Sequence, residues 1–574
     1  MAAARPSRVR AAPAFLHDEQ ASHHEVAALL AQFRNPMAEA VVSSSSDEES
    51  DTESGPEEGE ERKEGDRRPP AYAWSTQHTP IRQFAFSPPR RPAHPFDHIN
   101  TPIDFFRLLI TDEFIDACAA YTNTYAQQRV DDAKENAAPS SHAAQWEETT
   151  ADEIRAVIGC LIYMGIVCMK DTRDYWAQAT AQPFITSTFS RNRFLALLSN
   201  LRVSDDEENE DDQLSKIRGM IQMLTASIQK YHYPDKDLTV DEAMILFKGR
   251  SSMRQHIAKK ASPTGFKVWM LVDVDSNYVY SFDIYTGKNK TRREEGATAA
   301  VVLKLITPLT ENSWHRIGMD GFFTSVELFE KLLSKGFYAV GTTRHNRKHF
   351  PKELLKEVET CQRGEYVWRQ HGRIVCFSWM DKKPVNLLST CSDPLAKSTI
   401  KRRTGKDLID VACPSVVPDY LRTMRGVDVF AQRLSYSKIG RRSKKWFYSL
   451  VWFMFDVAIH NAFILHQKKH KQQHYGEKDF RKQLMDELIN GFTSRKTKGR
   501  ARTLPKRPRD SLHLLAHSDH HGDCVQCRPK LSDGKHGHRS HWKCESCQVF
   551  LCMPNCYNKH IQLTATERVD MIDE

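Results

Sequence analysis

The architecture of this chain can be predicted from one stretch, Gly265-Phe-Lys-Val-Trp-Met-Leu-Val-Asp273-Val-Asp275-Ser276, and from the extended run Tyr278-Val-Tyr-Ser-Phe-Asp-Ile-Tyr285 that follows it. Residues 268–272 form an unbroken apolar run rich in β-formers, which predicts a strand buried on both faces. Turn-forming residues at 275–277 indicate that the two runs form a hairpin. A carboxylate at the end of a buried strand, as at Asp273, requires a specific role.

Two further aspartates occupy comparable positions. In Arg316-Ile-Gly-Met-Asp320 a short strand ends on the carboxylate, and Ser325 can cap the amphipathic helix that follows. Asp428 precedes a basic segment that favours a helix. Three carboxylates brought together cannot all stay ionised without cations, and two Mg²⁺ ions about 4 Å apart are held in this way for phosphoryl transfer. Spacing alone leaves open the alternative that all three are ordinary cap or turn residues.

The chain resembles the piggyBac family of DNA transposases over roughly residues 96–561. The resemblance is carried by five segments in the same order: Leu238–Arg250, the hairpin from Gly265 to Gly287, Asp320–Ser325, Val340–Arg344 and Gly426–Asp428. It implies an RNase H-like catalytic domain in which Asp273, Asp320 and Asp428 bind catalytic Mg²⁺ or Mn²⁺ ions. Asp275 is a less favoured substitute for Asp273, because the ungapped spacing from Gly265 to Tyr278 fits the earlier residue.

Two positions depart from the pattern of that family. Gly321 stands where the family usually has asparagine. Ala431 stands where it usually has a further aspartate, three residues after Asp428. Both changes leave the three metal-binding acids in place, but the loss of an acid at residue 431 bears on full catalytic competence.

At 574 residues the chain is too long for a single core. The resemblance implies a mixed α+β, multidomain fold, with an RNase H-like α/β core, a helical domain split around it and a cysteine-rich domain. The expected segments are a disordered acidic tail (1–95), the first part of a helical dimerisation and DNA-binding domain (96–260), the catalytic domain (261–435) with an insertion at about 345–415, the second helical part (436–492), a basic linker (493–516) and a zinc-binding domain (517–562).

The distribution of charge favours a nucleic-acid partner. The chain has 82 Lys and Arg against 73 Asp and Glu, and many of the acids crowd into runs at 43–54 and 57–64. The remainder is therefore more basic than the net charge of +9 suggests, which suits contacts with phosphates. The acidic run Ser204–Asp212 repels itself and is assigned to a solvated loop. Asp241-Glu242 is assigned a structural or DNA-facing role, because neighbours on a strand point to opposite faces.

Residues 446–465 are mostly apolar and long enough to span a membrane. Asp456, His460 and Asn461 lie in the second half of this segment. An acid at the centre of a membrane helix costs about 3 kcal/mol, so we expect a buried core helix and no membrane partner.

Basic residues precede that helix, and they suggest a contact with DNA. The candidates are Arg441, Arg442, Lys444, Lys445 and Trp446. The face of Trp446 could support an unpaired or flipped nucleotide, although a core tryptophan is the alternative. Residues 495–509 are dense in Lys and Arg and contain no acid, which predicts a linker that acts as a nuclear-import signal and tethers phosphates.

A cysteine cluster near the C-terminus predicts two Zn²⁺ ions. Its ligand candidates are Cys524, Cys527, Cys544, Cys547, Cys552, Cys556 and His560, with His517 as first choice for an eighth ligand and His541 as second. Thiolate pairs separated by two residues chelate tetrahedral Zn²⁺ at about 2.3 Å, and so small a module needs metal to fold. Clustering of this kind favours metal ligands over disulfides.

Together these features predict a nuclear, dimeric, Mg²⁺-dependent cut-and-paste transposase that acts on double-stranded DNA and takes no small-molecule substrate. The resemblance adds terminal inverted repeats as the DNA bound, hairpins at the excised ends and TTAA as the target. The alternative is a domesticated nuclear DNA-binding or regulatory protein without cleavage activity, which Ala431 favours and the three acids disfavour. A ubiquitin-ligase role for the zinc module is a third reading, disfavoured because its middle lacks a close Cys-x-His pair.

Overall fold

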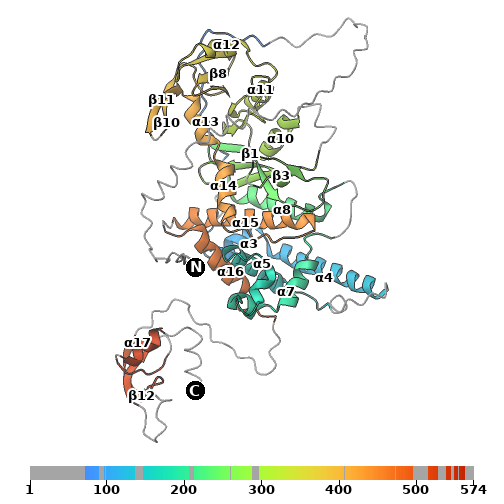
Figure 1. Ribbon diagram of the computed structural model, residues 1–574, viewed down its shortest axis with the longest axis vertical. Coiled ribbons are helices and arrows are strands. Elements are labelled where there is room, and N and C mark those ends of the chain that lie inside the picture. Colours follow the sequence, from blue (N-terminus) through green and yellow to red (C-terminus); the bar gives the residue numbers. More distant parts are fainter. Residues whose placement is uncertain are drawn as a thin grey trace, which may run out of the picture. The chain divides into compact units, whose positions relative to one another are not determined.

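The computed structural model in Figure 1 describes residues 72–89, 96, 98–135, 146–205, 212–258, 260, 262–287, 297–405, 407–471, 474–494, 515–527, 538–544, 548–553 and 555–562. Two compact units make up the chain, Met1–Arg495 and Lys496–Glu574. The acidic runs of the N-terminal tail, most of Ser204–Asp212 and the basic run at 495–509 lie outside the described residues.

A nine-stranded sheet forms the centre of the first unit, in the order β2-β3-β1-β5-β6-β9-β8-β7, with β4 also paired to β3. Its first six strands are β1 (Asp237–Leu246), β2 (Gln255–His256), β3 (Thr264–Asp273), β4 (Val279–Ile284), β5 (Arg316–Met319) and β6 (Tyr338–Thr342). β1, β3 and β4 are antiparallel neighbours, whereas β5 and β6 run parallel to β1. The sheet therefore changes from antiparallel to parallel pairing at the β1–β5 border.

The predicted hairpin is confirmed as β3 and β4. Asn277 occupies its turn with a φ of 62°, a left-handed conformation that asparagine tolerates. Helix α10 (Ala297–Ile306) packs on β3 and β4, and α8 (Ser215–Tyr231) also packs on β4. Figure 1 shows α10 on one side of β1 and β3, and α8 with α15 on the other. Cover on both faces explains why the apolar run of β3 is continuous.

The parallel half of the sheet begins where β5 leads into Asp320. The backbone N–H of Leu328 donates to the Ser325 hydroxyl oxygen at 3.2 Å, which confirms Ser325 as the cap of α11 (Val326–Ser334). Helix α11 packs against β6, which lies parallel to β5.

The region expected to be an insertion at about 345–415 partly continues the central sheet. β9 (Pro384–Ser389) pairs with β6, and β8 (Ile374–Met380) and β7 (Tyr366–His371) follow in antiparallel order. β8 and β9 are antiparallel neighbours and lie side by side in this part of the sheet. Helix α12 (Glu353–Glu359) packs on β7 and β8, and β10 (Lys397–Thr404) with β11 (Asp407–Pro414) forms a separate hairpin.

Residues 72–89 lie against this end of the sheet, so the expectation of a tail disordered as far as residue 95 is wrong for this segment. Ser75 forms an isolated β-bridge with Gln370 of β7, with both N–H···O distances at 2.9 Å. Trp74 donates its indole N–H to the His349 carbonyl at 2.9 Å, and Phe84 stacks on Trp314 at 4.2 Å. Scattered aromatic residues anchor the segment, although its low overall hydrophobicity indicated disorder.

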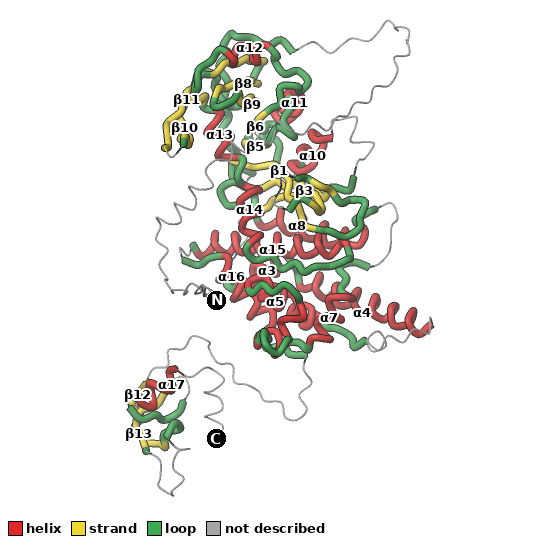
Figure 2. The backbone as a smooth tube through the Cα atoms, viewed as in Figure 1, coloured by secondary structure: helices red, strands yellow, loops and turns green. Residues whose placement is uncertain are grey.

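Helices from both ends of the first unit share one hydrophobic core. They include α3 (Pro102–Leu109), α4 (Asp112–Glu135), α5 (Ala151–Ile166), the 3₁₀ helix η1 (Thr172–Trp176), α6 (Pro183–Thr188), α7 (Arg191–Asn200), α15 (Trp446–His470) and α16 (Glu477–Ile489). α16 packs on α5, and α15 packs on α3 and α8. In Figure 2 these red helices form a layer on one side of the yellow central strands. Thr150 caps α5, because the backbone N–H of Glu153 donates to its hydroxyl oxygen.

Helix α15 is long and apolar enough to cross a membrane, but 94% of that window is buried inside the structure. Its polar residues also bind partners. Asp456 forms an ion pair with Arg481 at 3.2 Å, and Asn461 bonds the backbone N–H and carbonyl oxygen of Val279 at 2.9 and 2.8 Å. These contacts confirm the prediction of a buried core helix.

The second unit has a small core. β12 (Leu515–Asp523) pairs antiparallel with β13 (Arg539–Cys544), and α17 (Asn555–Gln562) follows. The buried residues of this core are Cys524, Cys544, Val549 and Leu551. So few apolar residues contribute little stability, which is typical of domains that depend on a metal.

Candidate active site

Asp241 and Asp320 lie side by side where the sheet changes from antiparallel to parallel pairing. In the parallel pair of β1 and β5, Val240 lies opposite Met319. The residue that follows each of them in the chain is an aspartate, Asp241 in β1 and Asp320 after β5. Asp241 is 6% exposed and Asp320 is half-buried. The register of one parallel strand pair therefore places two carboxylates at the same level of the sheet.

The third carboxylate comes from a helix that packs closely on these strands. Helix α13 (Val416–Thr423) leads to α14 (Gly426–Ser435), which packs on β1 and β3 and carries Asp428 in its first turn. A Cβ atom at Gly426 would lie 3.1 Å from the Thr239 hydroxyl oxygen and 3.4 Å from a Val272 methyl carbon. The lack of a side chain at Gly426 thus allows the close approach of α14 to the sheet.

The electrostatics of these acids show that they form one group. Burial raises the pKa of Asp241 well above its ordinary value, and the neighbouring charges of Glu242, Asp320 and Asp428 raise it further. Desolvation also raises the pKa of Asp320 and of Asp428, and Glu242 adds to both shifts. The Asp428 residue is exposed to solvent.

One ammonium group lies among these acids. Lys260 Nζ is 3.3 Å from Glu242 Oε1 and 4.0 Å from Asp241 Oδ1. Although neighbours on a strand point to opposite faces, a single ammonium approaches both Asp241 and Glu242. Lys260 partly offsets the raised pKa of all three aspartates.

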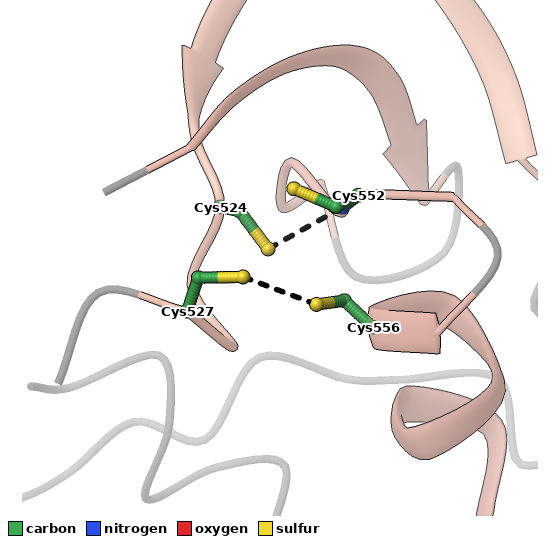
Figure 3. Close-up of side chains that lie close together, drawn as sticks. All are labelled: Cys524, Cys527, Cys552 and Cys556. Atoms are coloured by element: carbon green, nitrogen blue, oxygen red, sulfur yellow. Dashed lines mark hydrogen bonds between the residues drawn. The ribbon is translucent and has the colours of Figure 1, made fainter. Parts of the chain in front are cut away.

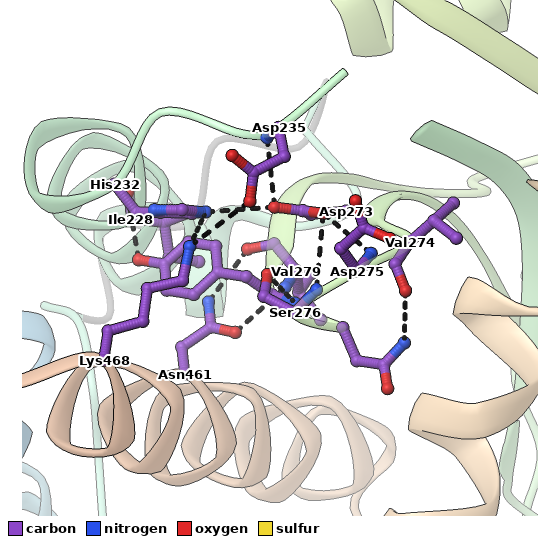
Figure 4. A network of polar contacts seen from close by, with 12 residues as sticks. Ile228, His232, Asp235, Asp273, Val274, Asp275, Ser276, Val279, Asn461 and Lys468 are labelled. Atoms are coloured by element: carbon purple, nitrogen blue, oxygen red, sulfur yellow. Dashed lines mark hydrogen bonds and ion pairs between the residues drawn. The ribbon is translucent and has the colours of Figure 1, made fainter. Parts of the chain in front are cut away.

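Asp273, predicted to be the first catalytic acid, lies at the other end of β1. It pairs with Leu238, whereas Asp241 pairs with Met270 further along β3. Figure 4 shows its carboxylate between His232 and the backbone of Asp235. The structure thus does not bring Asp273 beside Asp320, because the register separates the two acids by three residues of strand.

The contacts of Asp273 give it a structural role. It accepts hydrogen bonds from the backbone N–H groups of Asp235 at 3.1 Å and Asp275 at 3.0 Å, and it pairs with His232 at 3.2 Å. Although burial opposes ionisation, these bonds lower the pKa of Asp273 to about 2. Asp275, the less favoured substitute, is exposed on the turn beside it. Asp273 therefore anchors the β3–β4 turn and the segment that enters β1.

The residue that the sequence analysis missed is Asp241. Leu238-Thr-Val-Asp241 is also an extended run that ends on an acid, so the signal used for Asp273 was present here. The adjacent Glu242 concealed it, since the pair was interpreted as two residues on opposite faces.

The three aspartates offer the kind of ligand atom that divalent cations prefer, although their carboxylate oxygens do not all lie within 4.8 Å of one another. Their ligand atoms are carboxylate oxygens, which Mg²⁺ and Mn²⁺ prefer. Crowding of like charges raises the pKa values of the group, and a bound cation would relieve that repulsion. The backbone N–H of Phe322 donates to Asp320 Oδ1 at 3.0 Å and fixes the orientation of that carboxylate.

The proposed DNA-contacting residues lie around the start of α15. Trp446 is half-buried and meets Phe266 edge-on at 6.3 Å, which fits the alternative of a core tryptophan. Lys445 donates to the Ser199 carbonyl at 2.9 Å. Arg442 and Lys444 are exposed. Arg441 lies over the Tyr175 ring, and burial lowers its pKa. The two exposed cations are thus the best placed to reach a phosphate.

A second candidate site, made of cysteines, lies in the C-terminal unit. The sulfur atoms of Cys524, Cys527, Cys552 and Cys556 point toward one another in Figure 3. Within the described ranges, this is the one group of three or more His, Cys, Asp or Glu ligand atoms that all lie within 4.8 Å of one another. Cys527 Sγ and Cys556 Sγ are 3.1 Å apart. Four thiols at this spacing fit one tetrahedral Zn²⁺.

The remaining predicted zinc ligands are not part of that group. Cys544 and His560 are buried in the same unit, and Cys547 lies outside the described residues. His517 stacks on His541 at 5.3 Å across the β12–β13 pair. The structure thus brings four of the proposed ligands together and leaves a second Zn²⁺ site as a prediction.

Comparison with known proteins shows the family to which the chain belongs. The family model described as Transposase IS4 matches residues 101–463, more than half of the chain, so the chain belongs to this transposase family. Within that class it is a member of the piggyBac group, as its relatives show. Human PiggyBac transposable element-derived protein 3 is 27% identical over 474 residues, which cover 79% of this chain and 75% of that protein.

Two further relatives extend the comparison. Human PiggyBac transposable element-derived protein 2 is 25% identical over 442 residues, covering 74% of this chain and 72% of that protein. The cryo-EM structure of the piggyBac transposase synaptic complex with hairpin DNA matches with a TM-score of 0.63 and 24% identity. It covers 80% of this chain and 96% of that chain, so the two share a mixed α+β fold.

Proposed function

We propose that the chain is a cut-and-paste DNA transposase with an RNase H-like core, and that Asp241, Asp320 and Asp428 form its catalytic metal site. The observation that carries this proposal is the register that sets Asp241 beside Asp320, with Asp428 on a helix packed over the same strands. A sheet of three antiparallel strands followed by parallel strands supports an RNase H-like assignment.

The three aspartates would hold Mg²⁺ or Mn²⁺, which would activate the attacking oxygen and stabilise the leaving oxygen in nicking and joining. The residues around them keep the carboxylates in place. Arg347 donates Nη2 to the Gly321 carbonyl at 2.9 Å and so holds the loop that follows Asp320. The close contact at Gly426 fixes the start of α14, and with it Asp428. A preorganised site of this kind limits the reorganisation needed during reaction.

The substrate in this proposal is double-stranded DNA, at terminal inverted repeats and TTAA targets, with hairpin ends as intermediates. Support comes from the solved relative, a piggyBac transposase synaptic complex with hairpin DNA. We further propose action as a homodimer in the nucleus, and one Zn²⁺ on Cys524, Cys527, Cys552 and Cys556, with a second on Cys544, Cys547, His560 and His517.

A second candidate function is a domesticated DNA-binding or regulatory protein that does not cut. Ala431, exposed on α14 three residues after Asp428, favours it, because the usual acid is missing there. The names of the human relatives describe element-derived proteins, which also supports this alternative.

The test is nicking of labelled duplexes that carry the inverted repeats flanking the coding sequence, with Mg²⁺ or Mn²⁺. Wild-type protein should nick at the repeat ends, and Asp320→Asn should bind the same duplex without nicking it. DNA binding with no nicking by the wild type would favour the domesticated protein. Loss of both binding and nicking in Asp320→Asn would contradict the assigned role of that carboxylate.

A further inference from the structure

Lys260 is unusual for a lysine in a loop, because acids surround its ammonium group. It lies between β2 and β3. Its Nζ approaches Glu242 Oε1 at 3.3 Å and Asp241 Oδ1 at 4.0 Å, and it donates to the Glu242 carbonyl oxygen at 3.3 Å. The side chain is 31% exposed. Three contacts from one ammonium fix the position of this charge at the edge of the acid group.

The charge of Lys260 acts on the whole acid group. Its attraction opposes the upward pKa shifts of Asp241, Asp320 and Asp428. In return, Asp241, Glu242 and Asp428 raise the pKa of Lys260 despite its burial. With its Nζ atom within 4.0 Å of two carboxylates, Lys260 is a counter-charge to this group of acids.

Glu242 holds this lysine from the other side. Its second carboxylate oxygen, Oε2, lies 3.8 Å from Lys267 Nζ, while Oε1 faces Lys260. Lys267 in turn lies over the Phe322 ring at 4.2 Å. Glu242 is thus engaged by two lysines. Lys260 lies closer to Glu242 than to Asp241, one of the acids proposed to bind metal.

We propose that Lys260 is a positioning residue whose ammonium serves as a tethered cation for the aspartates when they hold no metal, and that metal binding must displace or repel it. The proposal rests on the proposed function, since it takes Asp241, Asp320 and Asp428 as the metal ligands. Lys260 would then raise the metal concentration at which the site fills, and it would keep the carboxylates together before filling.

The experiment is a Mn²⁺ titration of the full chain, with free Mn²⁺ followed by electron paramagnetic resonance. Lys260→Gln removes the charge but keeps a hydrogen-bond donor for the Glu242 carbonyl. We expect it to lower the Kd for Mn²⁺ about tenfold, because a positive charge about 4 Å from a ligand no longer opposes the ion. Its metal-free melting temperature should fall. Lys260→Arg, which keeps the charge, should bind Mn²⁺ within about threefold of wild type.

Controls separate this inference from the proposed function. Lys335→Met removes a lysine that follows the last residue of α11 and pairs with Glu311 at 2.6 Å, and this change should leave the Kd for Mn²⁺ unchanged. Asp241→Asn should weaken Mn²⁺ binding, and wild-type binding by that variant would overturn the metal site itself.

If Asp241→Asn weakens binding but Lys260→Gln has an unchanged or higher Kd, only the tethered-cation proposal fails. Lys260→Met is a second variant without the charge, in case Lys260→Gln does not fold. Each of these two variants that retains a native circular dichroism spectrum must show the decrease in the Kd for Mn²⁺. Equal affinities of Lys260→Gln and Lys260→Arg would also overturn the proposal, since the two differ in charge.

Discussion

The two aspartates at opposite ends of β1 can be told apart by exchanging each for asparagine. Asp241→Asn removes a proposed metal ligand that is crowded by other acids. Asp273→Asn removes a carboxylate that backbone N–H groups and His232 surround. The structure therefore predicts opposite effects of the same chemical change on stability and on cleavage.

The size of each effect follows from the contacts. Asp273→Asn keeps one acceptor oxygen, but its amide N–H group replaces the second oxygen and faces a backbone N–H donor. Hydrogen bonds to charged groups contribute about 1.5–3 kcal/mol each. We expect this variant to lose about 2–4 kcal/mol of unfolding free energy. Asp241→Asn relieves charge repulsion in the metal-free protein, so its unfolding free energy should be unchanged or about 1 kcal/mol higher.

The assay pairs urea unfolding without metal with nicking of repeat-end duplexes in Mg²⁺. Asp241→Asn should unfold at or above the wild-type midpoint and should nick at least about a thousandfold more slowly, a barrier increase of about 4 kcal/mol. Asp273→Asn should unfold at a lower urea concentration than wild type. At urea concentrations well below its unfolding midpoint, where it is still folded, its nicking rate should be within about tenfold of the wild-type rate. The reasoning is refuted if Asp273→Asn is as stable as wild type and inactive while Asp241→Asn still cleaves.

Three further predictions concern stability. Although burial opposes ionisation, hydrogen bonds lower the pKa of Asp273 to about 2 from its ordinary 3.8, so the ionised carboxylate should make wild type about 2 kcal/mol more stable than Asp273→Asn above pH 4. Urea unfolding midpoints should show this difference in stability shrinking as the pH falls toward 2. A difference that stays constant with pH would contradict the prediction. Asn461→Ala should lower the unfolding free energy by about 2–4 kcal/mol, because it leaves two buried backbone groups of Val279 unbonded; a loss below about 0.5 kcal/mol in urea titrations would count against those bonds. Cys527→Ser should release Zn²⁺ and remove the protease resistance of residues 515–562, as a chelator should for wild type, whereas retention of one Zn²⁺ per chain on that site by mass spectrometry would argue against the four-cysteine ligand set.

Local patterns in the sequence predicted much of this architecture. The β3–β4 hairpin, the strand before Asp320 and the cap at Ser325 all depend on residues near one another in the chain. The burial of α15 also followed from its own composition, because Asp456 and Asn461 require polar partners in a folded interior.

The choice between Asp241 and Asp273 could not be made in the same way. Both acids end an extended run, and only the pairing of β1 with β5 shows which of them lies beside Asp320. That register joins segments about eighty residues apart, so it depends on tertiary packing and leaves no mark on local periodicity. The placement of residues 72–89 was missed for a similar reason, since Ser75 and Trp74 contact partners almost three hundred residues away.

The shared core of α3, α5, α15 and α16 has a consequence for biosynthesis. The apolar face of α5 is synthesised early but packs against α16, which ends at Ile489. This face therefore stays without its packing partner until α16 has been synthesised. A ribosome adds about 5–20 residues per second, so the interval between completion of these two helices lasts roughly 15–70 seconds. During that time the nascent chain exposes a large apolar surface, and chaperones that bind such surfaces should associate with it until the last helix of the layer has emerged.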